Sequence, residues 1–230
     1  MSAALRLLNL PPLTTRGAPA GPAQSPHTQP APWTPADWAG RIVEVTGSAS
    51  SGCTTFVAHM VAAAQREGEP TAWLQLRDGS LYPPDLAALG VDLQALLVGL
   101  LPDGAGLLQA ADILLRSGSW GLVVLDPDTM PLAISDAQLG RLLGLCQKHA
   151  AALVLLSRQA GQQRGTGPAF GSLVSLRLEV SRPLPGQTPA LHTPCPLTIE
   201  AVKDKRRGPG KRLTQRWAWP EDCVDGSPAP

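Results

Sequence analysis

Short apolar runs alternate with longer amphipathic segments through the middle of this chain. Continuous apolar runs of this kind are typical of strands that are buried on both faces of a parallel sheet. On this basis we predict strands at 41–46, 71–76, 121–125 and 151–156. Apolar positions at helical spacing predict a helix that ends near residue 67, a second at 104–116 and a third at 135–149 with Ser135 as its N-cap. The alternation predicts an α/β domain with a mostly parallel central sheet flanked by helices.

The patterns in the rest of the chain are weaker. Residues 86–89 predict a short helix, and residues 95–100 predict a buried strand or a loop. Residues 158–169 are polar, rich in Gly and Gln and without periodicity, so we predict a mobile loop there. Beyond it, residues 173–180 predict a half-exposed strand, and residues 197–202 and 213–219 predict a C-terminal β-hairpin that turns at 208–210. Period two places one set of side chains on a single face of the hairpin, namely Leu213, Gln215, Trp217 and Trp219.

Changes in composition divide the chain into three predicted parts, which are an N-terminal tail at 1–36, a core domain at 37–220 and a disordered tail at 221–230. Pro, Ala, Gly, Gln and Thr dominate residues 11–35, and such a segment cannot bury enough apolar surface to become ordered. Residues 3–10 predict either a frayed terminus or a short amphipathic helix that docks on a partner. The docking side chains of that helix would be Leu5, Leu7, Leu8 and Leu10.

Composition and charge limit the classes of function. The chain has 230 residues with 43% hydrophobic content, which is enough for one sizeable core. Its four cysteines are scattered without a CxxC pair, so we expect neither a metal site nor a secreted disulfide framework. No apolar stretch reaches the roughly 18 residues of a membrane span. The first residues do not predict a signal peptide either, so we expect a cytoplasmic protein that does not bind a membrane.

The stretch between the first predicted strand and its helix has the spacing of a Walker A phosphate loop. It consists of Gly47, Ser48, Ala49, Ser50, Ser51, Gly52, Cys53, Thr54 and Thr55. Two glycines allow the backbone N–H groups to turn inward around a phosphate, next to the positive end of a helix. Cys53 stands where the motif has lysine, and a neutral thiol cannot supply that positive charge. The alternative is an ordinary turn of small residues between a strand and a helix.

The order of motifs from about residue 38 to 219 resembles the RecA-like ATPase core. Besides the loop, four strings carry the resemblance: Leu81-Tyr82-Pro83-Pro84-Asp85-Leu86-Ala87-Ala88-Leu89-Gly90-Val91-Asp92, Ala110-Ala111-Asp112-Ile113-Leu114-Leu115-Arg116-Ser117-Gly118 before Val123-Val124-Leu125-Asp126, Ser175-Leu176-Arg177-Leu178-Glu179-Val180, and Val202-Lys203-Asp204-Lys205. The resemblance implies a RecA-like P-loop core with a C-terminal β-hairpin.

The resemblance also implies roles for individual residues. Asp126 would be the Walker B carboxylate that orients the water shell of Mg²⁺, and Thr54 would be the hydroxyl ligand beside it. Asp78 falls near the glutamate that activates the attacking water in RecA, and Arg158 or Gln159 falls where RecA has a glutamine that senses the γ-phosphate. The alternatives are a polar strand end for Asp126 and a turn residue for Asp78.

A basic stretch follows in the predicted hairpin. Between Lys203 and Arg216 the local charge is +6, against −5 for the rest of the chain and a net charge of +1, so a local basic patch is allowed and an overall basic protein is excluded. Candidate contacts to DNA or to a partner are Lys203, Lys205, Arg206, Arg207, Lys211 and Arg212. The resemblance implies that Lys203 and Lys205 match lysines that reach a neighbouring subunit's nucleotide in RecA filaments, and the alternative is a solvated strand face.

The departures from RecA favour a narrower family. A missing lysine at Cys53, an aspartate at Asp78, a shortened loop at 158–169 and a Pro-rich tail in place of RecA's long N-terminal helix together resemble the ImuA-like proteins, which are RecA-derived accessory factors of bacterial SOS mutagenesis. The degenerate phosphate loop and the string Tyr82-Pro83-Pro84 are the features that favour this family. This resemblance implies a non-catalytic protein without a cofactor, or with at most weak binding of ATP and Mg²⁺ at a vestigial site. The implied partners are RecA, an ImuB-like Y-family polymerase homologue and a C-family polymerase.

Two other functions stay open at this point. One is an active RecA-type, DNA-dependent ATPase of recombination and repair that tolerates Cys53. The other is a RecA-like regulator that binds single-stranded DNA, in which basic groups would act together with stacking tryptophans such as Trp217 and Trp219.

Overall fold

The computed structural model describes residues 33–48, 50–128, 130, 132–159, 170–182 and 195–217. Several predictions concern residues outside this part of the chain. They are the N-terminal tail up to residue 32, including the docking helix with Leu5, Leu7, Leu8 and Leu10, and the C-terminal tail at 221–230. Ala49 of the phosphate loop, residues 160–169 of the predicted mobile loop and Trp219 also lie outside it. Nothing is described of the side chains of Gln159, Cys195, Gln215, Arg216 and Trp217.

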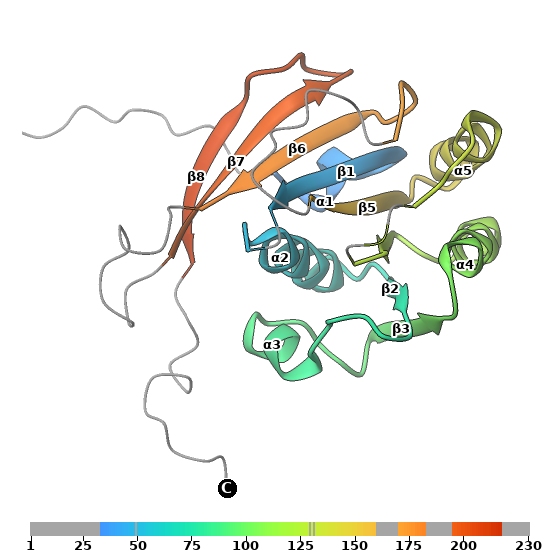
Figure 1. Ribbon diagram of the computed structural model, residues 1–230, viewed down its shortest axis with the longest axis horizontal. Coiled ribbons are helices and arrows are strands. Elements are labelled where there is room, and N and C mark those ends of the chain that lie inside the picture. Colours follow the sequence, from blue (N-terminus) through green and yellow to red (C-terminus); the bar gives the residue numbers. More distant parts are fainter. Residues whose placement is uncertain are drawn as a thin grey trace, which may run out of the picture.

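Within the described residues, eight strands form one sheet in the order β3-β2-β4-β5-β1-β6-β7-β8 (Figure 1). The strands are β1 Arg41–Ser48, β2 Thr71–Leu76, β3 Leu96–Leu101, β4 Leu122–Asp126, β5 Ala152–Gln159, β6 Leu176–Ser181, β7 Cys195–Asp204 and β8 Arg212–Trp217. Neighbouring strands from β3 to β6 are parallel. The pairs β6–β7 and β7–β8 are antiparallel. The predicted α/β core with a C-terminal β-hairpin is confirmed.

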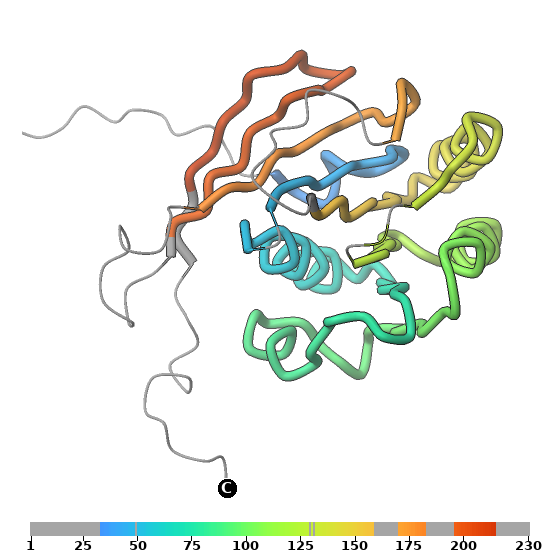
Figure 2. The backbone as a smooth tube through the Cα atoms, in the orientation of Figure 1, coloured from blue at the N-terminus to red at the C-terminus, as the bar shows by residue number. Residues whose placement is uncertain are grey.

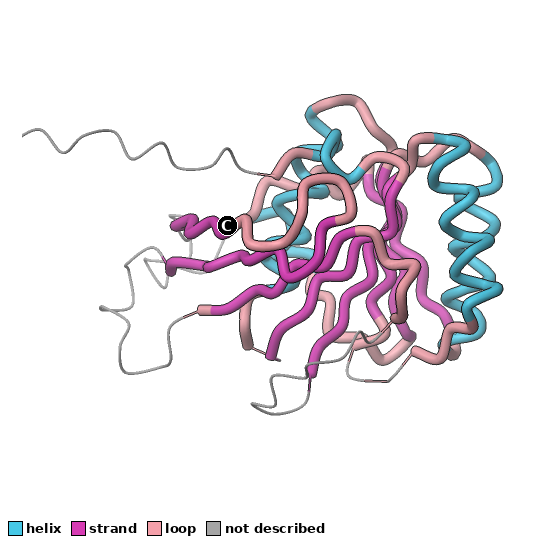
Figure 3. Tube along the Cα trace, turned by 90° about the horizontal axis from the view of Figure 1, so that it is seen from above, coloured by secondary structure: helices cyan, strands magenta, loops and turns pink. Residues whose placement is uncertain are grey.

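Helices cover both faces of the sheet, as the view from above shows (Figure 3). They are α1 Pro35–Trp38, α2 Cys53–Arg66, α3 Pro83–Ala88, α4 Gly104–Ser117 and α5 Asp136–His149. Buried residues of α1, α2 and α3 belong to one hydrophobic cluster, and those of α4 and α5 belong to a second cluster on the other face. Among the described residues, none of the helices combines the length and the hydrophobicity that a membrane span requires.

Local sequence explains where the helices begin. Helix α3 starts three residues before the predicted position because prolines occupy its first turn, where a missing N–H costs nothing. Helix α5 begins where it was predicted. The Ser135 hydroxyl accepts a hydrogen bond from the Gln138 amide, and the Gln138 side chain in turn bonds the Ser135 amide, which completes a capping box.

The prediction that residues 95–100 are buried is wrong for most of the strand that forms there. β3 lies at one end of the described sheet, where it has a neighbouring strand on one side alone. Leu96 is buried, but Leu97, Val98 and Leu100 are 41%, 41% and 54% exposed. The apolar run correctly predicted a strand. Whether that strand is buried depends on its place in the sheet, which an apolar run does not predict.

Trp33, which precedes the predicted boundary at 37, packs with the core of the described domain. Trp33 is 6% exposed, and Trp38 is fully buried with its ring edge-on to Phe56 of α2 at 5.8 Å. Arg41, at the start of β1, donates to Asp204 at the end of β7 over 2.5 Å, and both side chains are at most 5% exposed. This pair joins the central strand β1 to the hairpin, which lies at the end of the sheet opposite β3 (Figure 2).

We predict that Asp204→Ala lowers the free energy of unfolding by about 3–5 kcal/mol, because it leaves the buried Arg41 guanidinium without its counter-charge. Burial raises the pKa of Asp204, but hydrogen bonds from Arg41 and from the Arg206 amide outweigh it, and the net pKa lies below the ordinary value. A carboxylate of depressed pKa stabilises the fold above its unfolded pKa of about 4, and this contribution is lost as pH falls through the folded pKa.

Denaturant unfolding at pH 7 and at stepwise lower pH measures both effects. The matched control is Arg207→Ala, which removes the pair with Asp37 by deleting an arginine side chain that is 58% exposed. The control should lose about 1 kcal/mol or less. Equal losses in the two variants would contradict the assignment of the buried pair.

Candidate functional site

The candidate site lies where the parallel strands end. β5 pairs with β1 on one side and with β4 on the other, so the carboxyl ends of these three strands are adjacent. The phosphate-loop residues begin with Gly47 and Ser48 at the end of β1, Asp126 ends β4, and Arg158 lies near the end of β5. In open α/β sheets, ligands bind at this edge.

The loop between β1 and α2 has the tight geometry that its two glycines predict. A Cβ atom at Gly47 would lie 2.3 Å from Ser51 Oγ and 2.5 Å from the Val180 carbonyl oxygen. Gly52 has a φ of 90° as the N-cap of α2, a conformation that other residues rarely adopt. The Ser51 amide donates to the Ser48 carbonyl over 3.0 Å, which closes a turn within the loop.

Cys53, in the position of the motif's lysine, is a buried neutral thiol. It begins α2, is 3% exposed, and its Sγ lies 3.1 Å from Ser51 Oγ. Burial is the main cause that raises the pKa of Cys53 to about 11, against smaller lowering effects from the Ser51 hydrogen bond and the charge of Arg158. Cys53 therefore brings no charge to the loop near neutral pH.

The prediction that the mobile loop begins at Arg158 is wrong. Arg158 and Gln159 continue β5, because β1 extends to Ser48 and pairs with β5 along its whole length, with Gly47 opposite Arg158. Leu156 is buried in the cluster on the α2 face of the sheet. Since side chains two residues apart share a face, Arg158 faces the start of α2.

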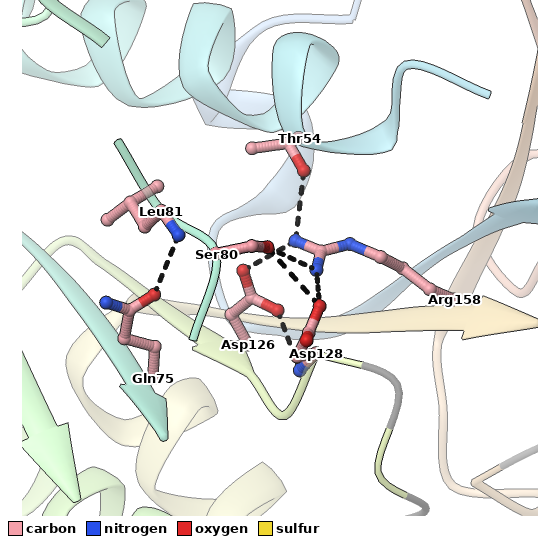
Figure 4. A network of polar contacts seen from close by, with 7 residues as sticks. All are labelled: Thr54, Gln75, Ser80, Leu81, Asp126, Asp128 and Arg158. Carbon is pink, nitrogen blue, oxygen red and sulfur yellow. Dashed lines mark hydrogen bonds and ion pairs between the residues drawn. The ribbon is translucent and has the colours of Figure 1, made fainter. Parts of the chain in front are cut away.

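Arg158 is the centre of a polar network that joins four segments of the chain (Figure 4). Its Nη2 donates to Asp126 Oδ2 over 2.7 Å and to Thr54 Oγ1 over 3.0 Å. Its Nη1 donates to Ser80 Oγ over 3.3 Å and also to Asp128 Oδ1. We call these five residues the Arg158 network.

Asp126 and Arg158 form the buried part of this network, with side chains 2% and 7% exposed. Burial raises the pKa of Asp126, and the charge of Arg158 and the hydrogen bond from the Asp128 amide partly offset that rise. That amide reaches Asp126 Oδ1 over 3.0 Å from a backbone φ of 57°, a left-handed conformation that Asp tolerates better than most residues. The carboxylate therefore depends on Arg158 for its counter-charge.

These residues, as placed, do not fit a Mg²⁺–nucleotide. The two oxygen groups that the resemblance assigns to the metal, on Thr54 and Asp126, both accept hydrogen bonds from Arg158. Cys53 lacks the charge that would reach the terminal phosphates. Within the described residues there is also no group of three or more His, Cys, Asp or Glu side chains placed to hold a metal ion.

The other predicted loop residues and Asp78 lie outside the buried part of the site. Ser48 and Ser50 are exposed, and Thr55 is half-buried in the first turn of α2. Asp78 lies exposed on the turn after β2, outside the Arg158 network. Ser80 and Asp128 belong to the network and were missed, although the string Asp126-Pro127-Asp128 at a strand end was a signal for a second carboxylate.

The side chains of five of the six basic candidates in the hairpin make polar or cation–π contacts with other residues of this protein. Arg206 donates to the Ala39 carbonyl over 2.9 Å, Arg207 pairs with Asp37 over 2.6 Å, and Lys211 lies over the Trp33 ring at 4.5 Å. Lys203 donates to the Ser172 carbonyl over 2.9 Å, and Arg212 lies 3.7 Å from Glu200. Lys205 is exposed. Much of the positive charge of this stretch therefore faces the N-terminal segment of the domain.

A strand–loop–helix with this glycine spacing, next to an acidic strand end in a parallel sheet, defines a P-loop-type α/β core. A family model for the RecA N-terminal domain matches residues 36–140. Over 87 residues, or 38% of this chain, the sequence is 47% identical to Protein RecA of Clavibacter michiganensis subsp. michiganensis and 41% identical to Protein RecA of Fusobacterium nucleatum subsp. nucleatum. It is also 41% identical over 103 residues, or 44% of this chain, to Protein RecA of Corynebacterium urealyticum.

The chain is therefore RecA-like in this region. The aligned segments cover 24%, 23% and 28% of the three relatives, so the chain spans about a quarter of the length of the curated relatives that it matches. The match covers the phosphate loop and Asp126, and it ends before Arg158.

We predict that the Cys53 thiol resists alkylation in the folded protein at pH 7–8, because burial keeps it neutral and covered. Peptide mass spectrometry after treatment with iodoacetamide measures its modification, before and after unfolding in denaturant. Cys146, which is buried with a pKa of about 12, should behave in the same way. Rapid modification of Cys53 in the native protein would contradict a buried neutral thiol.

Proposed function

We propose that this chain is a non-catalytic, RecA-like accessory protein of SOS translesion mutagenesis, of the ImuA type. The observation that carries the proposal is the state of the phosphate-loop site. Cys53 is neutral in the position of the lysine, and Arg158 holds Thr54 and Asp126. On this proposal the site binds ATP and Mg²⁺ weakly or not at all, and the protein acts by binding other proteins.

Chemistry at this site would face two separate losses. Removing one positioned donor to the transition state typically costs about 10²–10³ in rate. A nucleotide would also have to displace Arg158 from a carboxylate that is 2% exposed. The relation to RecA, a family of ATPases, favours a catalytic function. We favour a binding function because of the residues at the site.

The exposed edge of the sheet supports a protein-binding role. β3 offers Leu97, Val98 and Leu100 to solvent beside backbone groups that have no strand on their outer side in the described sheet. Tyr82, just before α3, is 61% exposed. An unprotected apolar edge strand is a surface on which a partner can add a strand.

The proposed partners follow from the resemblance to the ImuA-like proteins. They are RecA, whose filament the chain would modulate, an ImuB-like Y-family polymerase homologue and a C-family polymerase, which together form the mutasome. We assign the β3 edge to one of these protein contacts. The predicted docking leucines of residues 3–10 remain candidates for another.

DNA binding through the basic stretch has less support. Arg206, Arg207 and Lys211 contact the segment from Trp33 to Ala39, so DNA phosphates would have to compete with these internal contacts. Filter binding at rising salt, with and without neutralisation of Arg206 and Arg207, would reveal a DNA contact as a steep loss of affinity.

We predict no ATP turnover above background by the unmodified chain, with or without single-stranded DNA. Cys53→Lys alone should leave nucleotide binding weak, since Arg158 still pairs with Asp126. The double change Cys53→Lys with Arg158→Gln should strengthen ATP binding at least tenfold over either single change, because it restores the cation and frees both the Thr54 hydroxyl for the metal and the Asp126 carboxylate for the metal's water shell. Equilibrium binding of a fluorescent ATP analogue measures this.

Asp126→Asn in the double variant is the control and should abolish the gain. Brisk ATP hydrolysis by the unmodified protein would end the proposal of a non-catalytic role.

We predict that Val98→Lys with Leu100→Lys weakens binding to the partner on the β3 edge at least tenfold while leaving the fold intact, because both side chains are already exposed. The matched control is Ile113→Lys on α4, whose side chain is 58% exposed and apolar but belongs to a helix. Surface plasmon resonance against RecA and each polymerase partner measures the affinities. Equal effects of the β3 and α4 variants on every partner would remove the β3 edge from the account.

A further inference from the structure

We propose that Arg158 is a permanent internal substitute for the divalent cation of this site, so that the carboxyl edge of the sheet is held together without metal or nucleotide. This inference rests on the proposed non-catalytic function and adds to it. Loss of the lysine explains why a nucleotide binds weakly. It does not explain why a guanidinium is bonded to both groups that the resemblance assigns to the metal and its water shell.

Two of the contacts of Arg158 are with Thr54 and Asp126, the groups that the resemblance assigns to the metal and to its water shell. The contacts of Arg158 reach the first turn of α2 through Thr54, the end of β4 through Asp126 and the turn after β2 through Ser80. Arg158 itself adds β5 as the fourth segment. A metal at a P-loop likewise joins the loop hydroxyl to the acidic strand end. The guanidinium joins the same two segments through a planar fork of N–H donors. Unlike a metal ion, it is covalently part of the chain and cannot dissociate from the site.

The charges of the network agree with this role. Two carboxylates, on Asp126 and Asp128, face one guanidinium, so the Arg158 network carries a formal charge of −1. Without the guanidinium, two carboxylates and two hydroxyls would remain at one place, with one carboxylate almost fully buried. One or two carboxylates with further oxygen groups and water are what Mg²⁺ usually binds. Removing Arg158 should therefore uncover a cation site that the wild-type chain fills by itself.

The local backbone explains why Arg158 can reach all these groups. Val124 and Val154 are paired between β4 and β5 and lie in the cluster on the α2 face. Asp126 and Arg158 follow on the same face by period two, and β5 extends beyond the end of β4. The Arg158 side chain therefore extends over the end of β4 towards α2, and it contacts Asp126 on the way.

The test compares thermal unfolding of the full chain, its Arg158→Ala variant and its Arg158→Gln variant, each with and without 5 mM MgCl₂. We expect both variants to lose about 6–12 °C in melting temperature without metal, because Asp126 keeps a buried charge without a partner. Millimolar Mg²⁺ should restore at least half of this loss. It should shift the wild-type chain by less than about 1 °C, since a ligand stabilises only a state that binds it.

Two controls separate a cation site from a general effect of salt. Arg158→Ala with Asp126→Asn removes the main carboxylate and should not respond to Mg²⁺. Arg207→Ala breaks another arginine–aspartate pair, with Asp37, far from this site in the sheet order, and should not respond either. Sodium chloride at matched ionic strength should reproduce none of the recovery.

A folded Arg158→Ala or Arg158→Gln variant whose melting temperature does not rise with Mg²⁺ would overturn the inference while leaving the proposed function intact. If neither variant folds, hydrogen exchange of residues 53–56 and 122–128 in the wild-type chain still tests the inference. Their protection should be unchanged by Mg²⁺ and by Mg²⁺ with ATP, and a marked increase would overturn the inference. ATP hydrolysis by the wild-type chain would instead end the proposed function.

Discussion

The ion pair between Arg158 and Asp126 is the interaction on which the candidate site depends. A buried carboxylate at the end of a central strand needs a counter-charge, and a metal ion normally supplies it at a P-loop. Here β5 supplies it from two residues beyond the buried Leu156. The same guanidinium bonds Thr54 at the start of α2 and Ser80 after β2. The start of α2, the end of β4 and the turn after β2 are thereby joined by one side chain of β5.

The parallel core was largely predictable because four of the eight described strands are buried on both faces. Strands β1, β2, β4 and β5 were predicted from continuous apolar runs, and α5 from its cap at Ser135. The exposed face of β3 was not predictable, since an apolar run looks the same in a central strand and in an edge strand. Trp33 lies before the predicted boundary at 37 and is nevertheless buried in the cluster on the α2 face, a contact that its Pro-rich surroundings do not encode.

The site was predictable only in part, for a related reason. Gly47, Gly52, Thr54 and Asp126 are separated by spacings that a motif records, and the structure brings them to one edge of the sheet. Arg158 was assigned to a loop because it begins a polar stretch, whereas pairing with Gly47 keeps it in β5. A partner strand thus extended β5 beyond its own apolar pattern. Local patterns record nothing of such pairing.

The central claim is that this RecA-like core keeps the shape of a nucleotide site whose cation is part of the chain. Isothermal titration calorimetry of the full chain with Mg²⁺–ATP tests it most directly, because it requires no turnover and no partner. The account predicts no binding heat up to millimolar nucleotide, in the presence or absence of Mg²⁺. A one-to-one isotherm with a micromolar Kd that requires Mg²⁺ would contradict it.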